Sequence, residues 1–183
     1  MPKNDSTHNV IVQDSFDTLF RTMVVEPILD RIPESVAPNL ITAINIPVRT
    51  AILVLAYLQS ENIFSMSCSL ISIFLIGFLF VAHEVIDDLD GMQARKTGQY
   101  SRFGEIFDHV LDAYGVPILG VSVAMALKLG PLAIVAGLWG PTVIYYLQLT
   151  LYRRSGVFVE PLVSGARSAC VGAATIVVVG TMN

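Results

Sequence analysis

Charged residues are scarce in this sequence. They make up 14% of 183 residues, against roughly 25% in a typical soluble domain. Hydrophobic residues supply 54% of the chain, and a soluble domain of this size would have more apolar surface than its core could bury. The shortage of charge therefore excludes an ordinary soluble domain and predicts that lipid forms part of the protein's surroundings.

Cysteine and basic charge are also in short supply. The two cysteines, Cys68 and Cys170, both lie in apolar stretches, and we expect small packing residues rather than a disulfide pair or metal ligands. The net charge of −4 argues against nucleic acid as a partner, because such binding needs a basic face. Residues 1–9 are polar and lack the apolar core of a cleavable signal, so the later helices are expected to drive membrane insertion.

Long apolar stretches divide most of the chain. A helix needs about 20 mostly apolar residues to cross a bilayer. Five stretches approach that length: residues 39–58, 63–82, 103–129, 131–151 and 167–183. Pro47 and Arg49 interrupt the first stretch, and the uncharged part of the last one is short. We predict an all-α integral membrane bundle of five to six transmembrane helices over residues 37–183.

The basic residues indicate how this bundle is oriented. Five of them follow the second and fourth predicted spans: Arg95, Lys96, Arg102, Arg153 and Arg154. The connection at residues 59–62 has no basic residue, and the connection near Lys128 has one. Because cytoplasmic loops are enriched in Lys and Arg, we expect the N-terminus and the loop near Arg95 to face the cytoplasm.

Residues 1–36 are predicted to form a cytoplasmic segment that contains an amphipathic helix. Apolar residues recur there at helical spacing: Phe16, Leu19, Phe20, Met23 and Val24. This pattern is typical of a helix that lies in the lipid headgroup region, and a helix packed on the bundle is the alternative. Pro27 is expected to end or bend it.

Aspartates are concentrated around the end of the second predicted span. Asp87 and Asp90 are three residues apart, so they share one side of a helix. Gly104, Asp108 and Asp112 are spaced four apart at the start of the next span, where they form a stripe along one face. Two neighbouring helices are therefore expected to direct two carboxylates each into one space.

Four carboxylates at a membrane boundary need compensation. An ionised side chain within a span costs roughly 2.5–3.5 kcal/mol, which protonation or a bound cation would relieve. Carboxylates without a Cys or His cluster favour a hard ion, Mg²⁺ or Mn²⁺, and a pair of such ions readily holds a diphosphate. Arg95, Lys96 and Arg102 add positive charge that suits an anionic nucleotide. The alternative is that the acids only pair with these basic residues, which explains Asp112, two turns into an apolar helix, poorly.

The aspartate segment as a whole reads D-x2-D-G-x2-A-R-x8-G-x3-D-x3-D from Asp87 to Asp112. This spacing resembles the signature of the CDP-alcohol phosphotransferase family, and the entry to the first span at residues 38–42, P-N-x-x-T, is also similar to that family. The resemblance implies an enzyme that moves a phosphate-linked group from a CDP-linked donor to a lipid or small alcohol acceptor, in a six-span core that forms homodimers.

The resemblance also assigns roles to residues. It implies that Asp87, Asp90 and Asp108 bind two Mg²⁺ or Mn²⁺ ions, with Asp112 as a further ligand or the general base. Four more residues would contact the donor: Gly91 and Ala94 by leaving space for cytidine and ribose, Arg95 by supporting the donor or the loop, and Gly104 by allowing close passage.

Histidine is the other candidate for proton transfer. His109 follows Asp108 directly, and its imidazole titrates near neutral pH, so it is either catalytic or a packing residue. His83 and Glu84, one turn before Asp87, are expected to play a supporting or structural role.

The choice of substrate stays open at this stage. The sequence Phe107-Asp108-His109 resembles the choline and ethanolamine phosphotransferase branch, which joins CDP-choline or CDP-ethanolamine to diacylglycerol. The alternative is a phosphatidyltransferase that uses CDP-diacylglycerol and a small polar alcohol; Arg153, Arg154 and especially Arg167 could then hold a phosphorylated acceptor. The expected location is the endoplasmic reticulum membrane in a eukaryote or the cell membrane in a prokaryote.

Two alternatives come from other classes of protein. An intramembrane prenyltransferase also uses Asp-rich motifs and Mg²⁺, but its two motifs lie far apart in sequence. A metal transporter would use intramembrane acids without needing the G-x2-A-R between them. Release of CMP from a CDP-alcohol distinguishes the proposed reaction from both.

Overall fold

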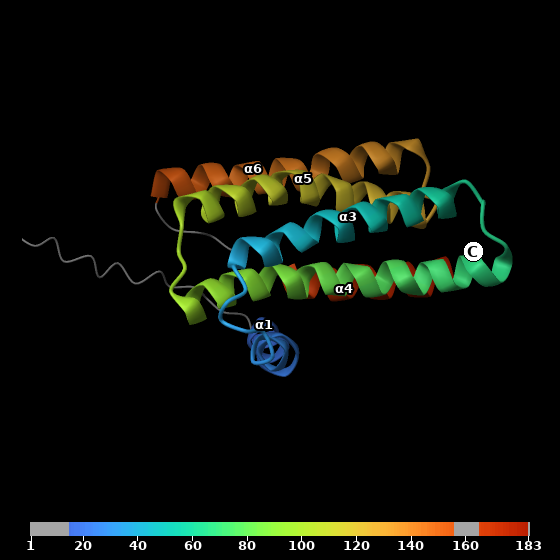
Figure 1. Cartoon of the computed structure of the whole chain (residues 1–183). Coiled ribbons are helices and arrows are strands. Elements are labelled where there is room, and N and C mark those ends of the chain that lie inside the picture. Colours follow the sequence, from blue (N-terminus) through green and yellow to red (C-terminus); the bar gives the residue numbers. More distant parts are fainter. Residues whose placement is uncertain (1–14, 156–164, 183) are drawn as a thin grey trace, which may run out of the picture.

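The computed structural model describes residues 15–155 and 165–182, and within these ranges it is helical without any strand (Figure 1). Five helices form the bundle: α3 Pro38–Ser60, α4 Met66–Thr97, α5 Arg102–Ala126, α6 Pro131–Ser155 and α7 Gly165–Gly180. Of these, α3 to α6 are long and apolar enough to cross a membrane. The prediction of an all-α membrane protein is confirmed. Four of the expected five to six spans are long and apolar enough to cross a bilayer. Helix α7 has 16 residues, about 24 Å at the helical rise, which is short of a bilayer core of roughly 30 Å.

The helix ends differ from the predicted spans at two places. Helix α4 continues from the apolar stretch to Thr97 and ends at Gly98, whose φ of 68° is the left-handed conformation that glycine adopts readily. The aspartates at its end therefore belong to one rigid helix. Helix α5 stops at Ala126 instead of residue 129, because Lys128 and Gly130 have positive φ angles of 53° and 84° and turn the chain into α6.

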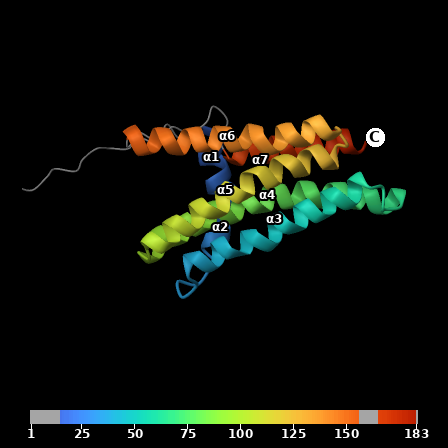
Figure 2. The same ribbon diagram turned by 90° about the horizontal axis from the view of Figure 1, so that it is seen from above.

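The long helices run side by side (Figures 1 and 2). Helix α3 lies against both α4 and α5, while α6 covers α5 and α7 covers α4. Apolar residues fill one half of the bundle, including Ile52, Ile73, Ile76, Phe80 and Ile176, all 5% exposed or less. The apolar contacts in this half pack the helices against one another.

Two glycines bring α5 and α6 into close contact. A Cβ atom on Gly120 would collide with the Gly137 carbonyl, and one on Gly137 would collide with the Gly120 carbonyl. Such small residues let membrane helices approach closely where lipid offers no hydrophobic force between them. The contact fixes α6 beside the helix that carries Asp108 and Asp112.

The N-terminal segment crosses beneath the long helices and is seen end-on in Figure 1 and lengthwise in Figure 2. It consists of α1 Ser15–Phe20, the π-helix η1 Arg21–Val25 and α2 Glu26–Leu29. Pro27 does not end the helix, since it lies in the first turn of α2, where a missing N–H is tolerated.

One side of this segment is buried against the bundle. Phe20, Val25 and Leu29 form a cluster with Ile41 of α3 and with Val85 and Leu89 of α4. Packing on the bundle, the alternative for this helix, is therefore observed. Leu19 and Met23 are 56% and 69% exposed, so an apolar edge still faces outward, and a headgroup location stays a prediction.

The cysteines agree with the sequence in part. Cys68 and Cys170 are both free thiols, as expected. Cys170 packs at the edge of the buried cluster around Phe20, whereas Cys68 is exposed. The packing role thus fits Cys170 only.

Candidate active site

Three carboxylates meet between α4 and α5. Asp87 of α4 and Asp108 and Asp112 of α5 each offer an oxygen within 4.8 Å of the others. The three are partly exposed, because they line the polar end of the bundle rather than its core. The two helices thus direct acids into one space, as their spacing predicts.

Asp90 is not a member of this group. Along a helix, three residues turn the side chain by about 60° and move it by about 4.5 Å, so Asp90 diverges from Asp87 toward the opening of the site. It is 8% exposed, and its Oδ2 accepts a hydrogen bond of 2.6 Å from the Thr42 hydroxyl of α3. Three of the four expected carboxylates thus cluster, Asp90 lies beside them at the cavity, and its role as a metal ligand stays a prediction.

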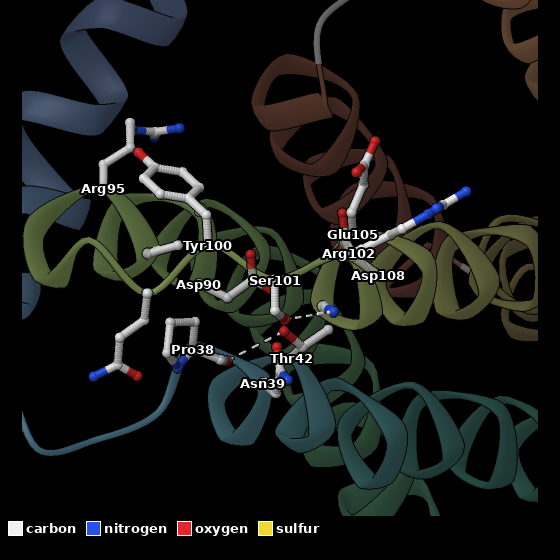
Figure 3. A pocket seen from close by; sticks show the side chains of 14 residues that line it. Pro38, Asn39, Thr42, Asp90, Arg95, Tyr100, Ser101, Arg102, Glu105 and Asp108 are labelled. Atoms are coloured by element: carbon white, nitrogen blue, oxygen red, sulfur yellow. Dashed lines mark hydrogen bonds between the residues drawn. The ribbon is translucent and has the colours of Figure 1, made fainter.

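A cavity of about 560 Å³ opens next to the three carboxylates, a size within the usual range for small-molecule sites of roughly 300–1,000 Å³. Its lining includes all four residues predicted to contact the donor and two of the acids: Gly91, Ala94, Arg95, Gly104, Asp90 and Asp108. Figure 3 shows Asp90 from α4 and Asp108 from α5 around the same opening. Asp108 belongs to both the cavity and the carboxylate group, and so it joins them.

The beginning of α3 forms another wall of the cavity. Pro38, Asn39 and Thr42 line it (Figure 3), so the short P-N-x-x-T pattern does belong to the site. Pro38 lies in the first turn of α3, where its fixed φ favours helix initiation. Thr42 is then one turn farther along, which sets its hydroxyl against Asp90.

The two glycines in the lining have different surroundings. A Cβ on Gly104 would lie 2.6 Å from Asn39 Oδ1 and 3.0 Å from Ser101 Oγ, so glycine is needed there for close approach of α3 and for the helix cap that Ser101 forms on the Gly104 N–H. A Cβ on Gly91 would meet only the Arg95 guanidinium, at 3.6 Å. Gly91 therefore leaves open space of the kind a nucleoside requires.

The basic residues of the loop split between two tasks. Arg95 and Arg102 line the cavity and extend to opposite sides of its opening (Figure 3). Lys96 points elsewhere, since its ammonium donates to the carbonyls of Leu29 and Ile32 at 3.0 and 3.3 Å. The expectation that Lys96 serves the nucleotide is not met, because it fastens the N-terminal segment to the end of α4.

Arg49 of α3 is the main site residue that sequence reasoning missed. Its Nη2 donates to Asp112 Oδ1 at 3.0 Å and to Asp87 Oδ1 at 3.3 Å, and Nη1 donates to the Leu111 carbonyl at 2.8 Å. The side chain is 8% exposed. A signal was present, because an arginine within an apolar span is costly unless it has a buried partner.

His109 lies beside the site without entering the cavity. Its Nδ1 donates to the Glu105 carbonyl at 2.7 Å, so Nε2 is the ring nitrogen that stays open to other partners. The Tyr145 hydroxyl of α6 donates to the backbone carbonyl of His109 at 3.1 Å. These bonds hold this turn of α5 in place, and the catalytic role of His109 stays a prediction.

The remaining histidine and arginine candidates have structural surroundings. His83 is 6% exposed and lies edge-on to Phe80, with ring centroids 6.0 Å apart, in agreement with a structural role. The Arg167 guanidinium lies 5.6 Å from the centroid of the Phe16 ring, where it contacts the N-terminal helix. Arg154 is exposed at the end of α6, and the side chain of Arg153 lies outside the described part of the chain.

Residues 35–182 match the family model described as CDP-alcohol phosphatidyltransferase. The chain belongs to this family. The match includes the whole aspartate signature, all four long helices and α7, and it favours CDP-alcohol chemistry over the prenyltransferase and transporter alternatives.

Several relatives cover part of the chain. It is 31% identical over 111 residues to an uncharacterized class-I family protein of Dictyostelium discoideum, which covers 58% of this chain and 27% of that protein. A CDP-diacylglycerol–serine O-phosphatidyltransferase of Encephalitozoon cuniculi is 32% identical over 78% of this chain and 37% of its own length. Human cholinephosphotransferase 1 is 30% identical over 56% of this chain and 25% of its own length. The matched part of the chain thus spans between 25% and 37% of the length of these relatives.

The family uses divalent metal, and the donor atoms present here suit it. Three carboxylates with oxygens within 4.8 Å are the ligand type that Mg²⁺ and Mn²⁺ prefer. Asp87 and Asp112 each use one oxygen on Arg49 and keep the other. Together with Asp108, they can surround one ion from two helices.

Proposed function

We propose that this chain holds the catalytic centre of a CDP-alcohol phosphotransferase that transfers a phospho-alcohol or phosphatidyl group to an acceptor hydroxyl and releases CMP. The observation that carries the proposal is the position of the three clustered carboxylates, Asp87, Asp108 and Asp112, directly beside a cavity lined by the remaining signature residues. A nucleoside in that cavity would place its diphosphate next to the carboxylates.

In this proposal the carboxylates hold divalent metal, Mg²⁺ or Mn²⁺ in up to two ions, which supplies positive charge for the diphosphate. Asp108 and Asp90 line the cavity and would lie nearest to the donor. Gly91 and Ala94 leave room for cytidine and ribose, and Arg95 at the opening would face the nucleotide. Gly104 contributes indirectly, by letting Asn39 of α3 close one wall.

Asp112 is the proposed general base, with His109 as the alternative. Arg49 donates to Oδ1 of Asp112 and leaves Oδ2 for the acceptor hydroxyl. The proton of the acceptor hydroxyl would move to Asp112 as the hydroxyl oxygen attacks the phosphorus distal to cytidine. His109 could do the same through Nε2, since its Nδ1 is engaged by Glu105.

We infer a cytoplasmic orientation from charge. The basic residues Arg95, Lys96, Arg102 and Arg154 lie at the end of the bundle where α3 and α5 begin and α4 and α6 end (Figure 1), and the cavity opens at that end. Enrichment of basic residues is typical of the cytoplasmic side. The compartment and the homodimer stay predictions.

Two donor types have support. The Phe107-Asp108-His109 sequence and the similarity to cholinephosphotransferases favour CDP-choline or CDP-ethanolamine with diacylglycerol. The similarity to a serine phosphatidyltransferase covers more of the chain and favours CDP-diacylglycerol with a small polar alcohol. We propose the first, with the second as the alternative.

A donor panel tests the function. Purified protein in lipid is given CDP-choline, CDP-ethanolamine or CDP-diacylglycerol with Mn²⁺ and the matching acceptors, and both CMP and the lipid product are measured. We expect CMP from at least one donor, dependent on metal, and phosphatidylcholine or phosphatidylethanolamine as product. Absence of CMP with every donor would contradict the proposal.

A further inference from the structure

Arg49 is unusually buried for an arginine, with a side chain that is 8% exposed. It is about three turns from the start of α3, and Asp112 is about three turns from the start of α5, so the two side chains sit at a similar depth in adjacent helices. A charged group at such depth needs a partner. Arg49 has two, because its Nη2 bridges Asp112 and Asp87.

The surrounding structure is shaped around this guanidinium. A Cβ on Gly115, one turn after Asp112, would collide with the Arg49 guanidinium, so the absent side chain leaves the space that the arginine fills. Asn45, one turn before Arg49 and 1% exposed, donates from Nδ2 to the same Asp87 oxygen at 3.2 Å. Oδ1 of Asp87 and Oδ1 of Asp112 are thus occupied by donors from α3.

This arrangement limits how much further positive charge the carboxylates can hold. With Asp90 beside them, the three carboxylates and the guanidinium carry a formal charge of about −3, and one divalent ion reduces this to about −1. A second ion would leave an excess of about +1 beside Arg49, which already uses one oxygen each of Asp87 and Asp112. The diphosphate of a CDP donor carries enough negative charge to offset that excess.

We propose that the Arg49 guanidinium supplies a permanent positive charge within the carboxylate group. One divalent ion can then bind without the CDP donor, whereas binding of a second ion depends on the donor's diphosphate. Arg49 is a positioning residue in this scheme, since it acts through Asp87 and Asp112. The inference rests on the proposed function in that it assumes the carboxylates bind metal.

Metal stoichiometry tests the inference directly. Mn²⁺ binding to the purified full chain in detergent is measured by titration with detection of free Mn²⁺, with and without CDP. The wild-type protein is expected to bind one Mn²⁺ alone and two with CDP. Arg49→Gln removes the charge with little loss of length, and it is expected to strengthen binding of the second ion without CDP by at least about tenfold.

A second variant keeps the arginine but moves it. Gly115→Ala introduces a Cβ into the space of the guanidinium, at a helical position where alanine is otherwise favourable, and should also allow two ions without CDP. If Arg49→Gln fails to fold, Gly115→Ala decides the question. Arg49→Lys retains the charge and is expected to keep one ion. Arg31→Gln, an exposed arginine that bonds to the Pro27 carbonyl, is the matched control and should behave as the wild type.

The possible outcomes distinguish failure of this inference from failure of the proposed function on which it rests. Two Mn²⁺ on the wild type without CDP, or one on both Arg49→Gln and Gly115→Ala, would overturn the role of Arg49 and leave the proposed function intact. No Mn²⁺ on any protein, with or without CDP, would overturn the metal assignment and the inference together. The expected stoichiometry without CMP release would contradict the proposed reaction only.

Discussion

Asp87 and Asp88 are neighbours on the same helix, yet they belong to different parts of the molecule. Asp87 faces α3 and α5, where it joins Asp108 and Asp112 and receives Arg49. Asp88 faces the N-terminal segment, where Arg21 Nε and Nη2 lie 2.8 and 2.7 Å from its Oδ1. One step along α4 turns the side chain by about 100°. That turn is enough to move a carboxylate from the group shared by α4 and α5 to an ion pair between α4 and η1.

The difference shows that the helix face, and not the residue type, determines what an aspartate does here. The Asp87 side faces a cavity and two further acids, so its charge needs a cation that the chain supplies only in part. On the Asp88 side the carboxylate pairs with Arg21, Lys96 bonds to the Leu29 carbonyl, and Gln93 bonds to the Pro33 carbonyl before α3. Adjacent faces of α4 therefore carry a cavity that can take a ligand and a structural contact with the N-terminal segment.

The largest effect is expected from Asp108→Asn. Asp108 belongs to both the carboxylate group and the lining of the cavity. A bound metal stabilises the transition state by several kcal/mol, so weaker metal binding should lower turnover by at least about 100-fold. CMP release at saturating donor and Mn²⁺ measures it. Near wild-type turnover in a folded variant would show that Asp108 has been misassigned.

Asp112→Asn is expected to lose turnover while it still binds CDP with metal, since Asp87 and Asp108 remain as metal ligands while the proposed proton acceptor is lost. CDP binding in the presence of Mn²⁺, compared with CMP release, separates the two roles. Loss of all CDP binding would instead make Asp112 chiefly a ligand.

Thr42→Val is expected to have a smaller effect, roughly tenfold in turnover, as is usual for a residue that orients a metal-site carboxylate. It removes the hydroxyl that donates to Asp90 at 2.6 Å and keeps the shape of the side chain. Thr50→Val is the matched control, because that hydroxyl bonds only within α3, to the Ile46 carbonyl, and is exposed. Equal loss in both variants would point to α3 itself rather than to Asp90.

The smallest effect is expected from Asp88→Asn. The pair with Arg21 is partly exposed, with the Arg21 side chain at 32%, and such pairs contribute up to about 1 kcal/mol. Turnover should stay within about twofold of the wild type, and the midpoint of thermal unfolding in detergent should fall by about 2–4 °C. A loss of turnover like that of Asp108→Asn would remove the distinction between the two sides of α4.

Much of the fold and part of the site could be predicted from sequence. Apolar length alone located α3 to α6, and three- and four-residue spacing placed Asp87, Asp108 and Asp112 on faces that do meet. The family signature also predicted the cavity lining at Gly91, Ala94, Arg95 and Gly104. These features are local, so one segment at a time is enough to find them.

Contacts between helices could not be predicted in the same way. The pairing of Arg49 with Asp112, of Thr42 with Asp90 and of Asn39 with Gly104 depends on how far α3 slides along α4 and α5. That register is set by packing of the apolar half of the bundle and leaves no periodic signal.

The central claim is that the Asp87 side of α4, and not the Asp88 side, binds metal. Anomalous scattering from Mn²⁺ in crystals of the protein tests it most directly. The account predicts a peak between the carboxylates of Asp87, Asp108 and Asp112. A peak beside Asp88, or none near the three carboxylates at saturating Mn²⁺ and CDP, would contradict it.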